Sequence, residues 1–254
     1  MCTLVLLRRP GHPWPMLLAA NRDEMADRPW RLPARHWPDQ PDVTAGLDVL
    51  GGGTWMGLND AGVVAAVLNR INTLGPAPGR RSRGELPLIA LAYPSAGEAA
   101  TAIAGLDPSA WRPFNMVVTD AGRAFCIRAT DGSEGTGGPP EVALEEVPPG
   151  VSMITAYDRN DLRSPRIGRY LPQFAAAPAP DPDRDDWAGW IALLAAREAD
   201  PEAGPGGAMT VVTPTGFGTV SSSLLALPDA HGSRPSWLFA AGRPGEAAYR
   251  RVPS

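Results

Sequence analysis

The stretch MCTLVLLRRPGHPWPMLLAANRDE, residues 1–24, carries two apolar runs on either side of a proline-rich turn. The runs at 3–9 and 16–24 have the character of strands, and the prolines between them prevent either strand from continuing. The stretch therefore predicts that the chain opens with an antiparallel hairpin. In that hairpin the polar end of the second run, residues 21–24, returns beside Cys2.

Turn signals further along the chain predict more antiparallel pairs. The sequence NDAG at 59–62 and the sequence DAG at 120–122 each separate two strand-like runs. Further strands are expected at 142–147, 151–156, 208–213, 218–228 and 236–242, the first two as a pair.

Helices are expected in two blocks. The first covers residues 82–106, is broken by Pro94 and resumes with Ser95 as its cap. The second covers 164–174 and 183–200, where Trp187, Trp190, Ile191 and Leu194 have the spacing of one buried helical face. Alternating hairpins and helical blocks predict an α+β fold, organised as a single domain over residues 1–254.

The composition excludes several classes of function. A formal charge of −4 with no basic run argues against a nucleic-acid partner. The chain has no lysine, which removes Schiff-base lysine chemistry. No apolar run approaches the length of a membrane span, and the three histidines lack the spacing of metal ligands. The partner expected is a small molecule, and the oligomeric state is open.

The two cysteines lie far apart in the sequence and do not form a disulfide framework, so a cytoplasmic protein is expected. Cys126 lies in a strand-like run and is expected in the core. If Met1 is removed, Cys2 carries both a thiol and a free α-amine. The amine has a reference pKa of about 7.7 to 8.0, so the residue supplies its own general base. The alternative is that a cysteine at this position is incidental.

The polar residues returning beside Cys2 suit such a site. Asp23 is placed to hold the α-amine by a hydrogen bond, and Arg22 is placed to stabilise a thiolate or to grip an anionic group of a substrate. The alternative reading is a charged strand end with a surface ion pair.

Several motifs in the same order resemble the NRDE family, whose founding animal members are called transport and Golgi organisation proteins. They are MCTLVLL, LLAANRDE, GGTWMGLNDAGVVAAVLN, SRGEL and FNMVVTD. The family is similar to the N-terminal nucleophile hydrolases that cleave penicillin V and conjugated bile acids. The resemblance implies a four-layer αββα sandwich, in which helical layers enclose two antiparallel sheets.

The resemblance also implies roles for single residues. Cys2 is the nucleophile, Asp23 orients its amine and Arg22 belongs to the same polar cluster. Asn69 matches an asparagine that helps to form an oxyanion hole, although its position also suits a turn. Substrate contacts are expected from two further asparagines, Asn21 and Asn160.

Two departures from the relatives stand out. In the bile acid hydrolases the arginine precedes the aspartate by three positions, whereas Arg22 directly precedes Asp23, so their side chains start on opposite faces of the strand. Many NRDE members carry an arginine where this chain has Val220, followed here by the neutral hydroxyls of residues 221–223.

Three functions follow as hypotheses. The first is an amidohydrolase that cleaves a non-peptide amide or a thioester through an acyl-cysteine intermediate, without a cofactor. The second is a carrier or chaperone that holds haem or an acyl lipid in the same pocket, and haem enters only there, as a ligand. The third is a scaffold whose polar residues stabilise the hairpin. It is less economical, because polar groups that converge on one strand end lose their water unless solvent or a ligand meets them.

Overall fold

The computed structural model describes residues 2–131, 139–229 and 234–253. The chain divides into two compact units, the first formed by Met1–Arg28 with Pro149–Ser254 and the second by Pro29–Pro148. Each unit is described by itself below. The expected single domain over residues 1–254 stays a prediction.

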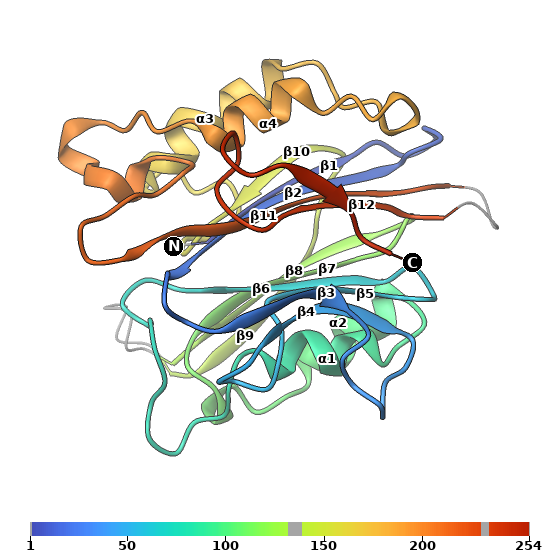
Figure 1. Cartoon of the computed structure of the whole chain (residues 1–254). Coiled ribbons are helices and arrows are strands. Elements are labelled where there is room, and N and C mark those ends of the chain that lie inside the picture. The colour runs from blue at the N-terminus through green and yellow to red at the C-terminus, as the bar shows by residue number, and fades with distance from the viewer. Residues whose placement is uncertain (1, 132–138, 230–233, 254) are drawn as a thin grey trace. The chain divides into compact units, whose positions relative to one another are not determined.

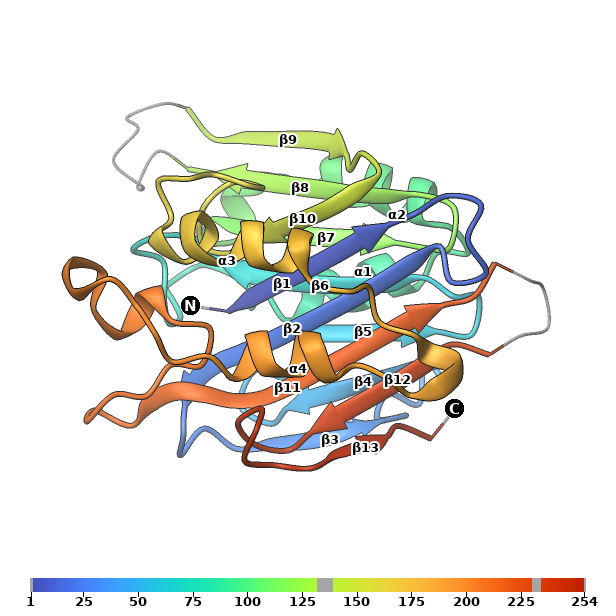
Figure 2. The same cartoon turned by 90° about the horizontal axis from the view of Figure 1, so that it is seen from above.

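The first unit is built on a six-stranded antiparallel sheet with the strand order β10-β1-β2-β11-β12-β13 (Figure 2). Its strands are β1 (Thr3–Arg8), β2 (Met16–Met25), β10 (Gly150–Ile154), β11 (Phe217–Leu227), β12 (Ser236–Ala240) and β13 (Tyr249–Arg251). Two helices, α3 (Pro165–Ala176) and α4 (Ala188–Ala195), cover one face of this sheet (Figures 1 and 2). The opening hairpin of β1 and β2 is confirmed.

Alternate residues of the central strands form the core beneath these helices. They pack against the helix residues Tyr170, Phe174, Trp190 and Leu194, and all of these side chains are buried. The two tryptophans of the second helical block, Trp187 and Trp190, are therefore core residues, as predicted. Phe174 and Trp190 meet edge to face with ring centroids 5.4 Å apart, a favourable aromatic geometry.

The second unit is built on a seven-stranded antiparallel sheet in which the strands follow chain order. They are β3 (Trp30–Ala34), β4 (Val43–Asp48), β5 (Met56–Asn59), β6 (Val64–Asn69), β7 (Phe114–Thr119), β8 (Ala124–Thr130) and β9 (Glu141–Glu146). The helices α1 (Glu85–Leu91) and α2 (Ala96–Ala104) pack on one face. Ser95 caps α2 by accepting a hydrogen bond from the amide of Glu98, as the sequence predicts.

Several predictions of strands were wrong. The runs at 142–147 and 151–156 do not pair: β9 pairs with β8, whereas β10 pairs with β1 in the other sheet. Two consecutive prolines, Pro148 and Pro149, interrupt backbone donation between them, so no tight hairpin closes there. The expected strand at 208–213 forms only an isolated bridge.

Other strands were missed. The edge strand β3 contains Pro33 and two adjacent exposed residues, Arg31 and Leu32, and therefore lacks the alternating pattern of a half-buried strand. The strands β4 and β13 were missed as well.

Cys126, expected in the core, is only half-buried on β8.

Replacing Gly53 with alanine is expected to destabilise the second unit. A Cβ atom at Gly53 would lie 2.3 Å from the backbone carbon and oxygen of Gly84, where no side-chain rotation relieves the clash. We expect the free energy of unfolding to fall by about 1–3 kcal/mol, measured by urea denaturation.

The matched control is Gly97→Ala in helix α2, where the nearest atom to a new Cβ is a flexible arginine nitrogen at 3.5 Å. That change is expected to be neutral or to stabilise by about 0.5–1 kcal/mol, because alanine favours the helix over glycine. Equal unfolding midpoints for the two variants would contradict the packing at Gly53.

Candidate functional site

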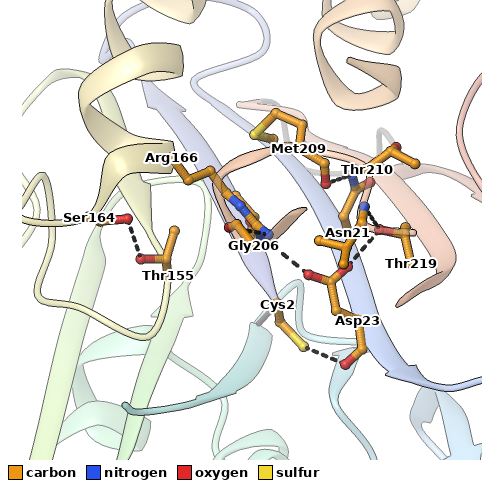
Figure 3. Close-up of polar contacts among 12 residues, drawn as sticks. Cys2, Asn21, Asp23, Thr155, Ser164, Arg166, Gly206, Met209, Thr210 and Thr219 are labelled. Carbon is orange, nitrogen blue, oxygen red and sulfur yellow. Dashed lines mark hydrogen bonds and ion pairs between the residues drawn. The ribbon is translucent and has the colours of Figure 1, made fainter. Parts of the chain in front are cut away.

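The register of the opening hairpin places Cys2 beside the polar end of β2. Thr3 pairs with Asn21, so one residue further along the two strands Cys2 comes opposite Arg22. The Cys2 Sγ donates a hydrogen bond to the backbone carbonyl oxygen of Asp23 over 3.7 Å (Figure 3). The predicted meeting of Cys2 with the 21–24 segment is therefore observed.

Alternation along β2 sends Arg22 and Asp23 to opposite faces of the sheet, as the sequence predicts. Asp23 shares the helix-covered face with Thr3 and Asn21, whereas Arg22 shares the face of the Cys2 thiol. The Asp23 carboxylate therefore points away from the Cys2 thiol. The Arg22 guanidinium, which the sequence left in doubt, is on the thiol's side.

The Asp23 carboxylate is completely buried and both of its oxygens are engaged. Oδ1 accepts a hydrogen bond from the Thr219 hydroxyl at 2.7 Å, and Oδ2 lies 3.2 Å from Nη1 of Arg166 (Figure 3). The exposed fractions of the two paired side chains are 0% and 1%. An ion pair this deeply buried is costly to desolvate and strongly destabilising when one partner is lost.

Arg166 connects three parts of the first unit. It donates from Nη1 to the Thr3 hydroxyl at 2.5 Å and from Nη2 to the Gly206 carbonyl at 2.9 Å. No sequence motif pointed to Arg166. Its spacing could have indicated that it is buried. Arg166 precedes the buried Tyr170 and Phe174 by four and eight residues, so all three lie on the same face of α3.

The Asn21 side chain lies between the sheet and helix α4. Its side chain is 1% exposed, and its Nδ2 donates to the carbonyl oxygens of Leu194 and Met209, each at 3.0 Å. Alternation along β2 directs this amide beneath α4, and the expected substrate-binding role stays a prediction. The Asn21 amide ties the helix and the following segment to the sheet.

Arg22 is 5% exposed, and its Nη2 lies 3.9 Å from Glu24. Burial raises the pKa of the Cys2 thiol above its ordinary value and the charge of Asp23 raises it further, while the Arg22 guanidinium lowers it. A thiol with a raised pKa is a poor nucleophile at neutral pH. The sulfur therefore needs a nearby base to take up its proton.

The two remaining asparagines, Asn69 and Asn160, belong to different units. Asn69 ends β6 in the second unit, paired in register with Phe114. Asn160 follows β10 in the left-handed conformation, with a φ of 57°. The side-chain Oδ1 of Asn160 accepts a hydrogen bond from the backbone N–H of Met153 at 2.7 Å. The backbone N–H of Asn160 donates to the carbonyl oxygen of Met153 at 2.9 Å. Asn160 therefore closes a backbone turn.

Val220 lies at an irregularity in the pairing of β11 with β2. Thr219 pairs with Asp23 and Ser221 with Arg22, so Val220 is the extra residue between them. The bulge lets both hydroxyl-bearing residues pair directly with Asp23 and Arg22 of β2.

Among the residues that the structure describes, no group of three or more histidine, cysteine, aspartate or glutamate side chains is arranged to hold a metal ion. Within the same described ranges, no helix combines the length and apolarity needed to cross a membrane.

Several solved structures are similar to this chain along most of its length. A penicillin V acylase from Agrobacterium tumefaciens is 14% identical, with a TM-score of 0.50, covering 94% of this chain and 83% of that one. An N-acylethanolamine-hydrolyzing acid amidase ortholog from Caenorhabditis elegans is 10% identical, with a TM-score of 0.55 and coverages of 90% and 94%. An arginine-to-leucine variant of the conjugated bile acid hydrolase from Clostridium perfringens is 12% identical, with a TM-score of 0.53 and coverages of 99% and 92%. These likenesses confirm the predicted α+β sandwich of the N-terminal nucleophile hydrolase type.

Similarity in sequence indicates a narrower group. A mouse Transport and Golgi organization 2 homolog is 39% identical over 74 residues, which are 28% of this chain and 26% of the relative. The human homolog is 42% identical over 57 residues, which are 21% of this chain and 20% of the relative. The matches thus span about a quarter or less of these relatives. The family model named Transport and Golgi organisation 2 matches residues 1–154, and the chain belongs to this family.

Proposed function

We propose that this protein is an N-terminal-cysteine hydrolase that cleaves a non-peptide amide or a thioester in a small molecule. The observation that carries the proposal is the contact of the Cys2 thiol with Asp23, whose carboxylate is held from two sides within an N-terminal nucleophile hydrolase fold. The names of the similar proteins, an acylase, an acid amidase and a hydrolase, support hydrolysis as the class of reaction.

The reaction starts from a chain without Met1. The freed α-amine of Cys2 takes the proton of the thiol, and the sulfur attacks the carbonyl carbon of the substrate. The tetrahedral intermediate collapses as the leaving amine or thiol receives that proton. Water, deprotonated by the same amine, then hydrolyses the acyl-cysteine bond and releases the acid.

Each remaining residue has a separate task. The contact of Cys2 with the Asp23 carbonyl supports Asp23 as the residue that orients the amine. Arg22, on the face of the thiol, favours the thiolate through its charge. The expected role of Asn69 as an amide donor to an oxyanion, worth about 3–4 kcal/mol where such a donor is present, stays a prediction.

The decisive experiment asks whether the purified protein presents a free N-terminal cysteine. The intact mass should show loss of Met1. The probe 2-cyanobenzothiazole should then form an adduct at Cys2, because the thiol adds to the nitrile carbon and the α-amine closes the ring with release of ammonia. Cys126, which has no α-amine, should form none.

A variant with one bulky residue inserted between Met1 and Cys2 provides the control. It should form no cyclised adduct, and iodoacetamide should alkylate its Cys2 at least about tenfold more slowly at neutral pH, because the raised pKa of the thiol is no longer offset by an internal base. Retention of Met1, or an acetyl cap on Cys2, in the protein isolated from its native cell would overturn the proposed function.

A further inference from the structure

The Asp23 carboxylate poses a problem for the chemistry just described. A negative charge beside an amine favours the protonated amine, yet a general base must be free of its proton near neutral pH. An uncompensated Asp23 would orient the α-amine of Cys2 but would also hold it in the protonated form. The structure contains a group that removes this conflict.

We infer that Arg166 is a positioning residue, which holds and neutralises the Asp23 carboxylate so that Asp23 orients the α-amine of Cys2 without locking it in its protonated form. This inference rests on the proposed function. Arg166 acts through Asp23, from the helix-covered face of the sheet, and needs no contact with a substrate.

The contacts of Arg166 suit this task. Its Nη1 lies 3.2 Å from Asp23 Oδ2 and 2.5 Å from the Thr3 hydroxyl, and Thr3 follows Cys2 directly. A single guanidinium therefore holds β1 and β2 at the two positions that bring Cys2 and Asp23 together. The carbonyl of Gly206 anchors the other nitrogen at 2.9 Å, so the guanidinium has a fixed orientation.

Among the residues that the structure describes, Arg166 is a charged group placed for this role. On β2, Arg22 lies on the opposite face of the sheet from the carboxylate, and its Nη2 lies 3.9 Å from Glu24. From β11, Thr219 and Ser221 contribute neutral hydroxyls. From α3, Arg166 forms an ion pair with Asp23, and the pair is fully buried, where charges interact most strongly.

The inference is tested by the pH at which alkylation of Cys2 by iodoacetamide reaches half of its maximal rate, measured by mass spectrometry. In Arg166→Met the uncompensated carboxylate should move this midpoint up by about one pH unit. In Asp23→Asn the uncompensated guanidinium should move it down. In the double variant, which removes both charges, the midpoint should return close to that of the unaltered protein.

Two further variants separate charge from packing. Arg166→Lys keeps the charge and should stay near the wild-type midpoint. Arg169→Met removes an exposed arginine of the same helix, which pairs with Asp200 at 3.1 Å, and should leave the midpoint unchanged. Circular dichroism establishes that each variant is folded. If Arg166→Met does not fold, the comparison of Asp23→Asn with the double variant still measures the effect of the guanidinium.

The outcomes also separate this inference from the proposed function. If Cys2 of the unaltered protein forms no adduct with 2-cyanobenzothiazole, the proposed function fails and the inference fails with it. If Cys2 reacts but Arg166→Met and Asp23→Asn shift the midpoint in the same direction or not at all, the inference alone is overturned. Opposite shifts that cancel in the double variant support it.

Discussion

Replacing Cys2 with alanine is expected to abolish acyl transfer by this protein while leaving its fold intact. Removal of the nucleophile in a covalent mechanism costs about 10³-fold or more in rate, because no other group of the site can form the intermediate. The measurement uses p-nitrophenyl acetate as the probe. A burst of p-nitrophenol and an acetyl adduct on Cys2 are expected for the unaltered protein, and neither for the variant.

Cys126→Ala is the matched control. It removes the other cysteine, which lies half-buried on β8 of the second unit, and should keep both the burst and the adduct. Full burst activity in Cys2→Ala would contradict the hydrolase mechanism. A protein whose Cys2 forms no acyl adduct, yet which binds haem with a Soret shift that Cys2→Ala removes, would instead support the carrier hypothesis.

The single variant Arg166→Met is expected to lower the free energy of unfolding by about 3–5 kcal/mol, because it leaves the Asp23 carboxylate buried without its counter-ion. The exposed fractions of 1% and 0% mean that solvent does not replace the lost partner. The double variant Asp23→Asn with Arg166→Met should recover most of this loss, since neither side chain then carries a charge. Urea denaturation followed by circular dichroism measures both variants.

A surface ion pair on the same helix serves as the control for this loss of unfolding free energy. Arg169 and Asp200 are 36% and 61% exposed, so Arg169→Met should cost about 0–1 kcal/mol. A similar small cost for Arg166→Met would mean that the Asp23 carboxylate does not depend on Arg166. A double variant less stable than the single one would mean that packing, and not charge, accounts for the loss.

Hairpins with clear turn residues could be predicted from the sequence. The strands around residues 59–62 and 120–122 pair as expected, because glycine and aspartate close short turns whatever the rest of the chain does. The pairing of β9 and β10 could not be predicted in the same way. Their runs have good strand patterns, but a pattern does not say which neighbour supplies the backbone partners.

The same difference between local and long-range contacts applies to the candidate site. Cys2 and Asp23 are separated by 21 residues within one hairpin, so their contact follows from a local register that apolar alternation and a proline-rich turn specify. The sequence of residues 1–24 is therefore enough to predict the meeting of Cys2 with Asp23. It also placed Arg22 and Asp23 on opposite faces, but did not say which face carries the thiol.

The contacts that hold the Asp23 carboxylate depend on long-range packing and could not be predicted from the sequence. Its two partners are distant in the chain, since Arg166 lies 143 residues away and Thr219 lies 196 residues away. An arginine in a helix and a threonine in a strand have no pattern that pairs them with a particular aspartate. They meet because α3 packs on the sheet and β11 pairs with β2, and burial of that carboxylate then makes both contacts necessary.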